Sequence, residues 1–194
     1  GAIISAVSLD AFWHAGAGSR LTDPHLIYDT LSGRWLTTSN ADPQLTTSKV
    51  LLAISQTSDP TGGWSFYTIA ADTTGTIWAD YPGIGVNSKW IVITNNMFSV
   101  AANIFVGAKM WVINKTTALS GGPLTANVFP ADFDRGSFTL KPAVTFDSAE
   151  ANLYIVNNRD SSVGGTTDYF QLSQITGTEA APIWSPVPDA AGPY

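Results

Sequence analysis

One unit of about sixty residues occurs three times along this chain, and this repetition limits the possible folds more than any other feature. Each copy opens with a proline and a short apolar run, and an Asp or Asn stands five positions after the proline. These openings lie at 24–29, 82–87 and 142–147, so the three prolines follow one another at nearly equal intervals. A fixed period is typical of proteins in which one small unit is copied and stacked on its neighbours.

Each unit contains four short apolar elements in the same order. They are rich in Val, Ile, Thr and aromatic residues and are bounded by Gly, Pro, Asn, Asp or Ser, which predicts strands joined by turns. The elements of the three units lie at 24–29, 34–37, 51–56 and 64–69; at 82–87, 89–93, 110–115 and 124–129; and at 142–147, 153–156, 170–175 and 183–187.

Four such strands per unit favour an all-β fold, a β-propeller with three four-stranded antiparallel blades. A sheet with two apolar faces cannot bury either face alone, so its copies stack around an axis. A β-sandwich and a β-solenoid are the alternatives, but a sandwich would not repeat so regularly and solenoid coils are usually shorter. The blades are predicted at 23–79, 80–140 and 141–194, and residues 1–22 would supply one or more strands of a preceding blade.

Three blades make only a partial ring, because propellers typically have four to eight. The opening segment 3–9 is apolar enough to be a strand that completes a blade lying outside these residues. Further blades of the same polypeptide, or a second copy of the chain, would complete the ring. We favour the first arrangement, in which these residues are a piece of a longer polypeptide.

Composition excludes several classes of partner and site. Nine basic residues and a net charge of −6 leave no basic stripe for nucleic acid or an anionic membrane surface. No run approaches the roughly 20 apolar residues that a membrane span requires, so none is expected. The lack of cysteine excludes disulfides, thiolate metal sites and cysteine nucleophiles. Absence of thiols together with few lysines fits a protein exported by a bacterium.

Three motifs carry a resemblance that covers most of the chain. The runs 23–35, 53–64 and 78–85 contain YDTLSGRW, SQTSDPTGGW and DYP. Taken together, they resemble a group of largely uncharacterised exported bacterial β-propeller proteins. The resemblance implies a propeller fold, a secreted or cell-surface location and a longer parent chain. It implies no reaction and no catalytic residue.

Asp80 is the candidate ligand-binding residue that stands out, because it lies between Trp78 and Tyr81 just before the innermost predicted strand of the second unit. Aromatic flanks of this kind stack on sugar rings, and glycosidases need two nearby carboxyl groups. Asp23 holds the corresponding place in the first unit, whereas the third unit has Lys141 there. The alternative, which we favour, is that these aspartates cap the turns that enter the strands.

Calcium is the candidate metal, because it accepts carboxylate, amide and carbonyl oxygens from loops. The oxygen-rich positions that could hold it are Asp132, Asp134, Asn158 and Asp160. Solvated loops without a metal are the alternative. A zinc site is not expected, because His14 and His25 are the chain's two histidines and no supporting motif accompanies them.

These observations predict a non-enzymatic extracellular binding or structural module, part of a larger secreted or surface protein. A glycan or a surface protein would be its partner. The alternative is a glycan-binding lectin or a glycoside-active enzyme that uses the loops entering the blades. Four tryptophans in strand elements, at 35, 64, 90 and 111, are expected in the core, and those at 13, 78 and 184 are candidates for an exposed sugar-binding platform.

Overall fold

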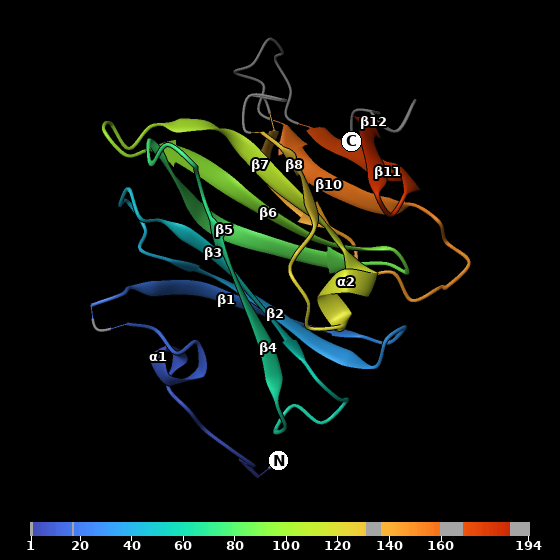
Figure 1. The fold of residues 1–194 in the computed structure, drawn as a ribbon. Helices are drawn as coiled ribbons and strands as arrows, with labels where there is room; N and C mark the ends of the chain where they lie inside the picture. Colours follow the sequence, from blue (N-terminus) through green and yellow to red (C-terminus); the bar gives the residue numbers. More distant parts are fainter. Residues whose placement is uncertain (1, 17, 131–136, 160–168, 187–194) are drawn as a thin grey trace.

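The computed structural model describes residues 2–16, 18–130, 137–159 and 169–186. In this part of the chain, three four-stranded antiparallel sheets account for the strands, as Figure 1 shows. Sheet A contains β1 (Leu21–Asp29), β2 (Arg34–Ala41), β3 (Lys49–Ser55) and β4 (Trp64–Ala70). Sheet B contains β5 (Ile77–Val86), β6 (Trp90–Ser99), β7 (Phe105–Asn114) and β8 (Ala126–Phe129). Sheet C contains β9 (Ser137–Pro142), β10 (Leu153–Arg159), β11 (Tyr169–Thr178) and β12 (Ala181–Pro186). The predictions of an all-β fold and of three four-stranded antiparallel sheets are therefore confirmed.

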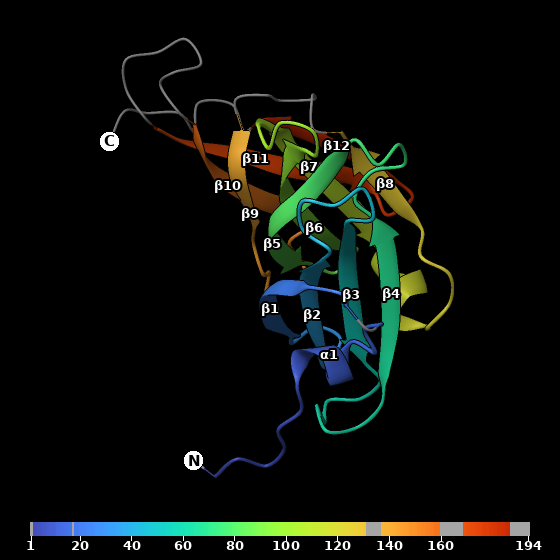
Figure 2. The same ribbon diagram turned by 90° about the vertical axis from the view of Figure 1, so that its left-hand side faces the viewer.

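The three sheets pack in series, with sheet B in the middle (Figure 2). Alternate residues of a strand point to opposite faces, and β6 uses both faces. Ile91 and Ile93 pack against sheet A, whereas Trp90 and Val92 pack against sheet C. Each sheet therefore buries a face that it could not bury alone, which is the packing expected of a stacked repeat.

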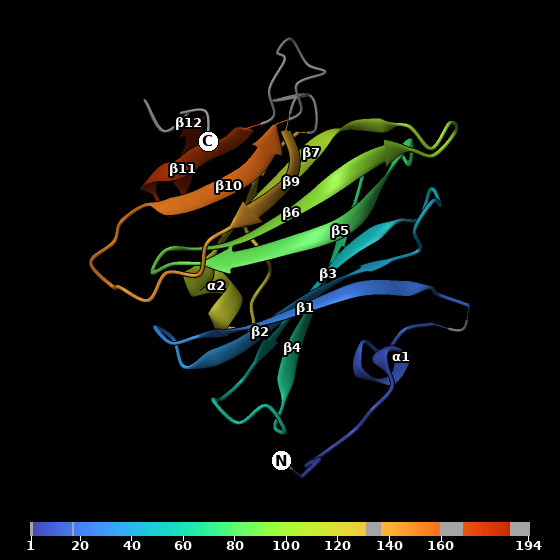
Figure 3. The ribbon, with the colours of Figure 1, turned by 180° about the vertical axis from the view of Figure 1, so that it is seen from behind.

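The first strand of each sheet lies on the inner side of the stack, where β1 packs on β5 and β5 packs on β9 (Figure 3). Val86 of β5 and Val144, just after β9, form a parallel bridge between two sheets. The close approach requires glycine at position 85. A Cβ there would lie 2.5 Å from both the Ala143 carbonyl oxygen and the Pro142 Cβ.

The first strand of the third unit differs from the prediction. We expected it at 142–147, but β9 ends at Pro142. Pro24 and Pro82 are each the second residue of a β-bulge in their strands, and the residue at the same point of β9 is Leu140. The alignment of the three prolines was therefore two positions out of step in the third unit.

The predicted strand over residues 3–9 is also absent from the described residues 2–16. The segment instead carries one short helix, α1 (Leu9–Phe12), because the Ser8 hydroxyl accepts a hydrogen bond from the Ala11 amide and caps its start. Phe12 and Trp13 pack against the outer face of sheet A. Residues 8–13 therefore cover sheet A and do not extend a sheet.

Two further details concern the connections. A second short helix, α2 (Lys115–Leu119), replaces part of the turn expected between the third and fourth strands of sheet B. The sheets begin at positions 21, 77 and 137, slightly ahead of the predicted blade boundaries at 23, 80 and 141. Among the helices of the described segments, neither is long and apolar enough to cross a membrane.

Candidate functional site

A β-bulge recurs at the same place in the innermost strand of every sheet. In each case two residues of the inner strand oppose one residue of the neighbouring strand. The bulges begin at Asp23, Tyr81 and Thr139, which are evenly spaced along the chain and have φ values of 51°, 50° and 54°. Non-glycine residues rarely adopt positive φ, and Thr is especially disfavoured because it is β-branched. Strained backbone conformations cluster at functional sites, so the three bulges are candidate positions for one.

Polar side chains on the second strand of each sheet hold the bulges in place. Opposite the first two bulges stand Ser39 and Asn95. The Ser39 hydroxyl donates to the Thr22 carbonyl at 2.6 Å, and the Asn95 amide donates to the Asp80 carbonyl at 3.2 Å. The strained backbone is thus supported by hydrogen bonds within its own sheet.

The bulge of sheet C is held by the neighbouring sheet. The Thr139 amide donates to Asn96 Oδ1 at 2.8 Å, and Asn96 Nδ2 donates to Thr139 Oγ1 at 3.0 Å. The Thr94 hydroxyl donates to the Leu140 carbonyl at 2.7 Å. These bonds fix sheet C against sheet B at the level of the bulges.

Tyr81 is the residue at which side chains from all three sheets meet. The His25 ring of sheet A packs edge-on against the Tyr81 ring, with centroids 5.8 Å apart. Lys141 of sheet C places its Nζ 4.0 Å from the centroid of the Tyr81 ring, within the range of a cation–π interaction. Asp23, whose charge acts on both His25 and Asp80, and Asp80 itself complete what we call the Tyr81 cluster.

The Tyr81 cluster perturbs its own titratable groups. Burial, with the negative charge of Asp23 as a second cause, raises the pKa of Asp80 above its ordinary value. Burial, and then the positive charge of Lys141, lowers the pKa of His25, so that this imidazole is neutral at pH 7. Burial also lowers the pKa of Lys141. Two carboxyl groups, an amine and a neutral imidazole in partly desolvated surroundings can bind polar ligands and exchange protons.

Beneath the cluster lies a buried pair of amides between sheets A and B. Asn95 Nδ2 donates to Asn40 Oδ1 at 2.9 Å, and both residues are buried. In the described part of the chain, Asn40 Nδ2 and Asn95 Oδ1 have no hydrogen-bond partner. Asn95 Nδ2 also donates to the Asp80 carbonyl at 3.2 Å, so this amide pair links sheet A to the bulge of sheet B.

The predicted ligand-binding residues are only partly brought together. Asp23, Asp80 and Tyr81 belong to the Tyr81 cluster, and Tyr81 is 44% exposed. Trp78 is buried, stacks on Phe98 with centroids 5.1 Å apart and donates its indole N–H to Asn103 Oδ1. It therefore offers no ring face to a sugar.

The other tryptophans divide differently from the prediction. Those at positions 13 and 184 are also buried, so neither contributes an exposed platform. Trp90 and Trp111 are core residues as expected, whereas Trp35 and Trp64 are only partly buried. Among the described tryptophans, the exposed aromatic face that we expected near the turns is therefore missing, and Tyr81 is the aromatic residue of the site.

The predicted calcium ligands are mostly beyond the described residues. Asp132, Asp134 and Asp160 lie outside them. Asn158 is in β10, paired with Phe138 and Phe170, and its side chain is exposed. No group of three or more His, Asp or Glu side chains suitable for a metal occurs in the described ranges. The calcium site stays a prediction.

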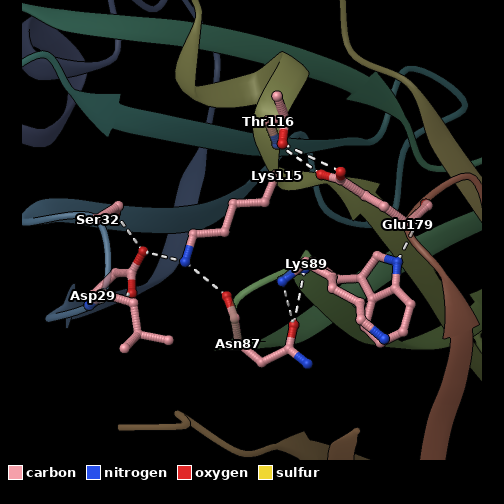
Figure 4. Close-up of polar contacts among 9 residues, drawn as sticks. Asp29, Ser32, Asn87, Lys89, Lys115, Thr116 and Glu179 are labelled. Carbon is pink, nitrogen blue, oxygen red and sulfur yellow. Dashed lines mark hydrogen bonds and ion pairs between the residues drawn. The ribbon is translucent and has the colours of Figure 1, made fainter. Parts of the chain in front are cut away.

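A second polar cluster lies at the opposite end of the inner strands (Figure 4). Lys115 Nζ lies 2.6 Å from Asp29 Oδ2 and donates to the Asn87 carbonyl at 2.6 Å. Both charged side chains are almost completely buried. The Asp29 carboxylate also accepts from the Leu31 amide and the Ser32 hydroxyl. Because these groups are satisfied by one another, we interpret the cluster as a structural clamp and not as a site.

The clamp extends to sheet C through Glu179. Its carboxylate accepts from the Thr116 amide at 2.8 Å and the Thr116 hydroxyl at 3.2 Å, and its carbonyl accepts from the Trp90 indole N–H at 3.2 Å. Asp29 belongs to sheet A, Lys115 follows the third strand of sheet B, and Glu179 lies between the last two strands of sheet C. Hydrogen bonds therefore link the three sheets at this end.

Sequence reasoning missed His25 and the strain at the bulges. His25 was considered only as a zinc ligand, and no glycine marks the positive φ at Tyr81 or Thr139. The equal spacing of Asp23, Tyr81 and Thr139 was the signal available, but the proline at 142 obscured it.

A scan against protein-family models and a search of the curated proteins give no match for this chain. Its function is therefore inferred from the geometry of its own side chains.

Proposed function

We propose that the three sheets are three blades of a β-propeller. The order of strands within each sheet supports this, because the first strand is innermost and the fourth is outermost in all three. The parallel bridge between Val86 and Val144 supports it further, since blades of a propeller place their first strands side by side around the axis. On this account the chain forms an arc of a ring that further blades or a second copy complete.

The function that we propose is that of a non-enzymatic extracellular binding module, with the Tyr81 cluster as its ligand site. The observation that carries this proposal is the convergence of side chains from three sheets on one half-exposed ring. A site built where blades meet is rigid, and its residues can vary without disturbing the scaffold. The lack of cysteine and the resemblance to exported bacterial propellers support the extracellular location.

One observation favours a second candidate, a lectin or a glycoside-active enzyme. Asp23 and Asp80 are close enough for the charge of one to raise the pKa of the other. A carboxyl group with a raised pKa beside a second carboxylate is the combination that glycosidases use as acid and nucleophile or base. The exposed part of Tyr81 would stack on a sugar ring.

A glycan array on the purified chain tests the site and separates the two candidates. Binding is expected to weaken at least about tenfold in Tyr81→Ala, because stacking on an aromatic ring and its hydrogen bonds are lost. The matched control is Tyr28→Ala, which lies in the same β1 strand as His25 but close to the far end of the inner strands.

The outcomes are distinct. Equal loss in both tyrosine variants, or unchanged binding in Tyr81→Ala, would place the ligand elsewhere. If no glycan binds above background, the lectin and the enzyme are both wrong. Release of reducing sugar that disappears in Asp80→Asn, while binding persists, would show that the site is catalytic and that the non-enzymatic proposal is wrong.

A further inference from the structure

Three buried polar atoms without a hydrogen-bond partner among the described residues belong to neighbouring side chains between sheets A and B. They are Thr22 Oγ1, Asn40 Nδ2 and Asn95 Oδ1. Thr22 of β1 stands opposite Asn40 of β2, and Asn40 accepts a hydrogen bond from Asn95 of β6 at 2.9 Å. Buried polar atoms in proteins are almost always hydrogen-bonded, so a group of three calls for one explanation.

The side chains of Thr22 and Asn40 both face sheet B. Their neighbours Leu21 and Ala41 pack with Trp13 on the outer face of sheet A, and successive residues of a strand point to opposite faces. Residues directly opposite each other in a sheet have Cβ atoms about 5 Å apart. The Thr22 hydroxyl and the Asn40 amide therefore face the same point of the interface with sheet B.

The orientation of both amides follows from their other hydrogen bonds. Asn95 Nδ2 donates to Asn40 Oδ1 and to the Asp80 carbonyl at 3.2 Å. Reversing the Asn95 amide would place its oxygen against these two oxygens, and reversing the Asn40 amide would bring two N–H groups together. Asn40 therefore keeps an N–H donor, and Asn95 keeps a carbonyl acceptor, for a further partner.

The contact between sheets B and C shows why this need arises only beside sheet A. Asn96 stands opposite the residue before the bulge of sheet B, as Asn40 does in sheet A. Its amide bonds directly to both the amide and the hydroxyl of Thr139 in the next sheet. The residue of sheet B at the place of Thr139 is Tyr81, which has no hydroxyl on its β carbon. Asn40 therefore lacks the direct partner that Asn96 has.

The chemistry of the three atoms defines what can bind them. Asn40 donates a hydrogen bond, Asn95 accepts one, and the Thr22 hydroxyl can do either. A bare cation would be repelled by the Asn40 N–H, and a bare anion would be repelled by the Asn95 carbonyl. The partner must therefore both accept and donate, as water does. Buried waters in proteins typically make about three hydrogen bonds to groups of this kind.

We propose that one water molecule is bound between sheets A and B by Thr22, Asn40 and Asn95. It accepts from Asn40 Nδ2, donates to Asn95 Oδ1 and bonds to the Thr22 hydroxyl, so it joins β1, β2 and β6. It also fixes the amide that holds the Asp80 carbonyl at the bulge of sheet B. The inference does not depend on any ligand at the Tyr81 cluster.

Nuclear magnetic resonance of the isotope-labelled chain tests the proposal through nuclear Overhauser contacts between water and side-chain amides. A contact from long-lived water to the Asn40 amide protons is expected. The Asn96 amide is the matched control, because Thr139 pairs with it directly and also brings a hydroxyl close to it. No contact at Asn40 overturns the proposal, and so do equal contacts at Asn40 and Asn96.

A crystal structure gives an independent test. A water oxygen is expected at about 2.7 to 3.2 Å from each of the three atoms. The proposal is overturned if Thr22 Oγ1, Asn40 Nδ2 and Asn95 Oδ1 instead bond to one another or to other protein groups.

Thr22→Val tests the contribution of the hydroxyl at nearly constant size. Loss of one hydrogen bond is expected to shorten the residence time of the water about fivefold, measured by magnetic relaxation dispersion. Thr68→Val on β4 is the matched control, because this exposed position should leave the residence time unchanged. An unchanged residence time in folded Thr22→Val, or an equal change in both variants, would show that the proposed set of partners is wrong.

Discussion

Three non-glycine residues adopt positive φ at equivalent points of the three sheets: Asp23, Tyr81 and Thr139. The cost of each such residue is of order 1 kcal/mol or more. Hydrogen bonds with Ser39, Asn95 and Asn96 support the three bulges in turn. The bulge turns the inner strand of sheet B so that the Tyr81 ring contacts side chains from both neighbouring sheets. The Tyr81 cluster is therefore a product of backbone geometry as much as of residue type.

Asp80 provides a test of whether the cluster is shaped for binding or for stability. Burial and the charge of Asp23 raise its pKa, so the folded chain disfavours the carboxylate. Asp80→Asn removes that charge at nearly constant size and is expected to stabilise the fold at pH 7. The gain should be small, on the order of 0.5 kcal/mol, because solvent still screens this half-buried group. Urea unfolding measures the change, and Asp10→Asn, at an exposed position, is the control with no gain.

The pH dependence of this gain has a definite sign. An acid whose pKa is raised in the fold binds more protons when folded, so its ionisation costs stability as the pH rises through the folded pKa. The difference in the free energy of unfolding between Asp80→Asn and the wild type should vanish below about pH 3.9, which is the pKa of an unperturbed Asp. Above that pH the difference should grow. A variant that is less stable at pH 7 would show that the carboxylate caps the turn, as the alternative for Asp80 holds.

At the scale of strands and helices, local patterns were informative and long-range contacts were not visible. Short apolar runs between turn residues predicted the number and order of the strands in sheets A and B, because strand and turn propensities act over a few residues. The bounds were less accurate: β5 and β7 begin five residues before the expected positions 82 and 110, and β6 runs on to Ser99. β9 was misplaced because Pro142 was aligned with Pro24 and Pro82, whereas the residue equivalent to those prolines is Leu140. The segment 3–9 was misread because Ser8 caps a helix that only the outer face of sheet A stabilises.

The clamp at the far end of the inner strands shows the same limit. Nothing local to Lys115 indicates that its amine reaches Asp29, far earlier in the chain. By contrast, the repeat itself placed Asp23 and Tyr81 in neighbouring units, so that part of the candidate site could be predicted. The contributions of His25 and Lys141 could not, because they depend on how the sheets pack.

Lys115→Met tests the clamp. It removes the cation and leaves the Asp29 carboxylate buried without its partner, which typically costs about 3 to 5 kcal/mol. We expect the free energy of unfolding to fall by about 3 kcal/mol, measured in urea. Lys49→Met is the matched control: its amine lies 3.5 Å from Asp42 but is 41% exposed, so the loss should stay below about 1 kcal/mol. Equal losses would mean that the buried pair has no special role.

At the scale of the whole molecule, the account depends on three sheets packed in series with their first strands side by side. That arrangement buries both faces of sheet B, brings the Tyr81 cluster together at one end of the inner strands and forms the clamp at the other. A sandwich of two facing layers would produce none of these together.

A cysteine pair at Val86 and Val144 tests this packing most directly, because the chain has no cysteine of its own. Partners in neighbouring strands lie about 4.8 Å apart, within reach of a disulfide. The account predicts that Val86→Cys with Val144→Cys cross-links under mild oxidation in the native state. The control pair, Val86→Cys with Ile183→Cys, should not, since β12 is the strand of sheet C farthest from β9. The packing of the three sheets would be contradicted if the first pair stays reduced in native chains. It would also be contradicted if both pairs cross-link equally.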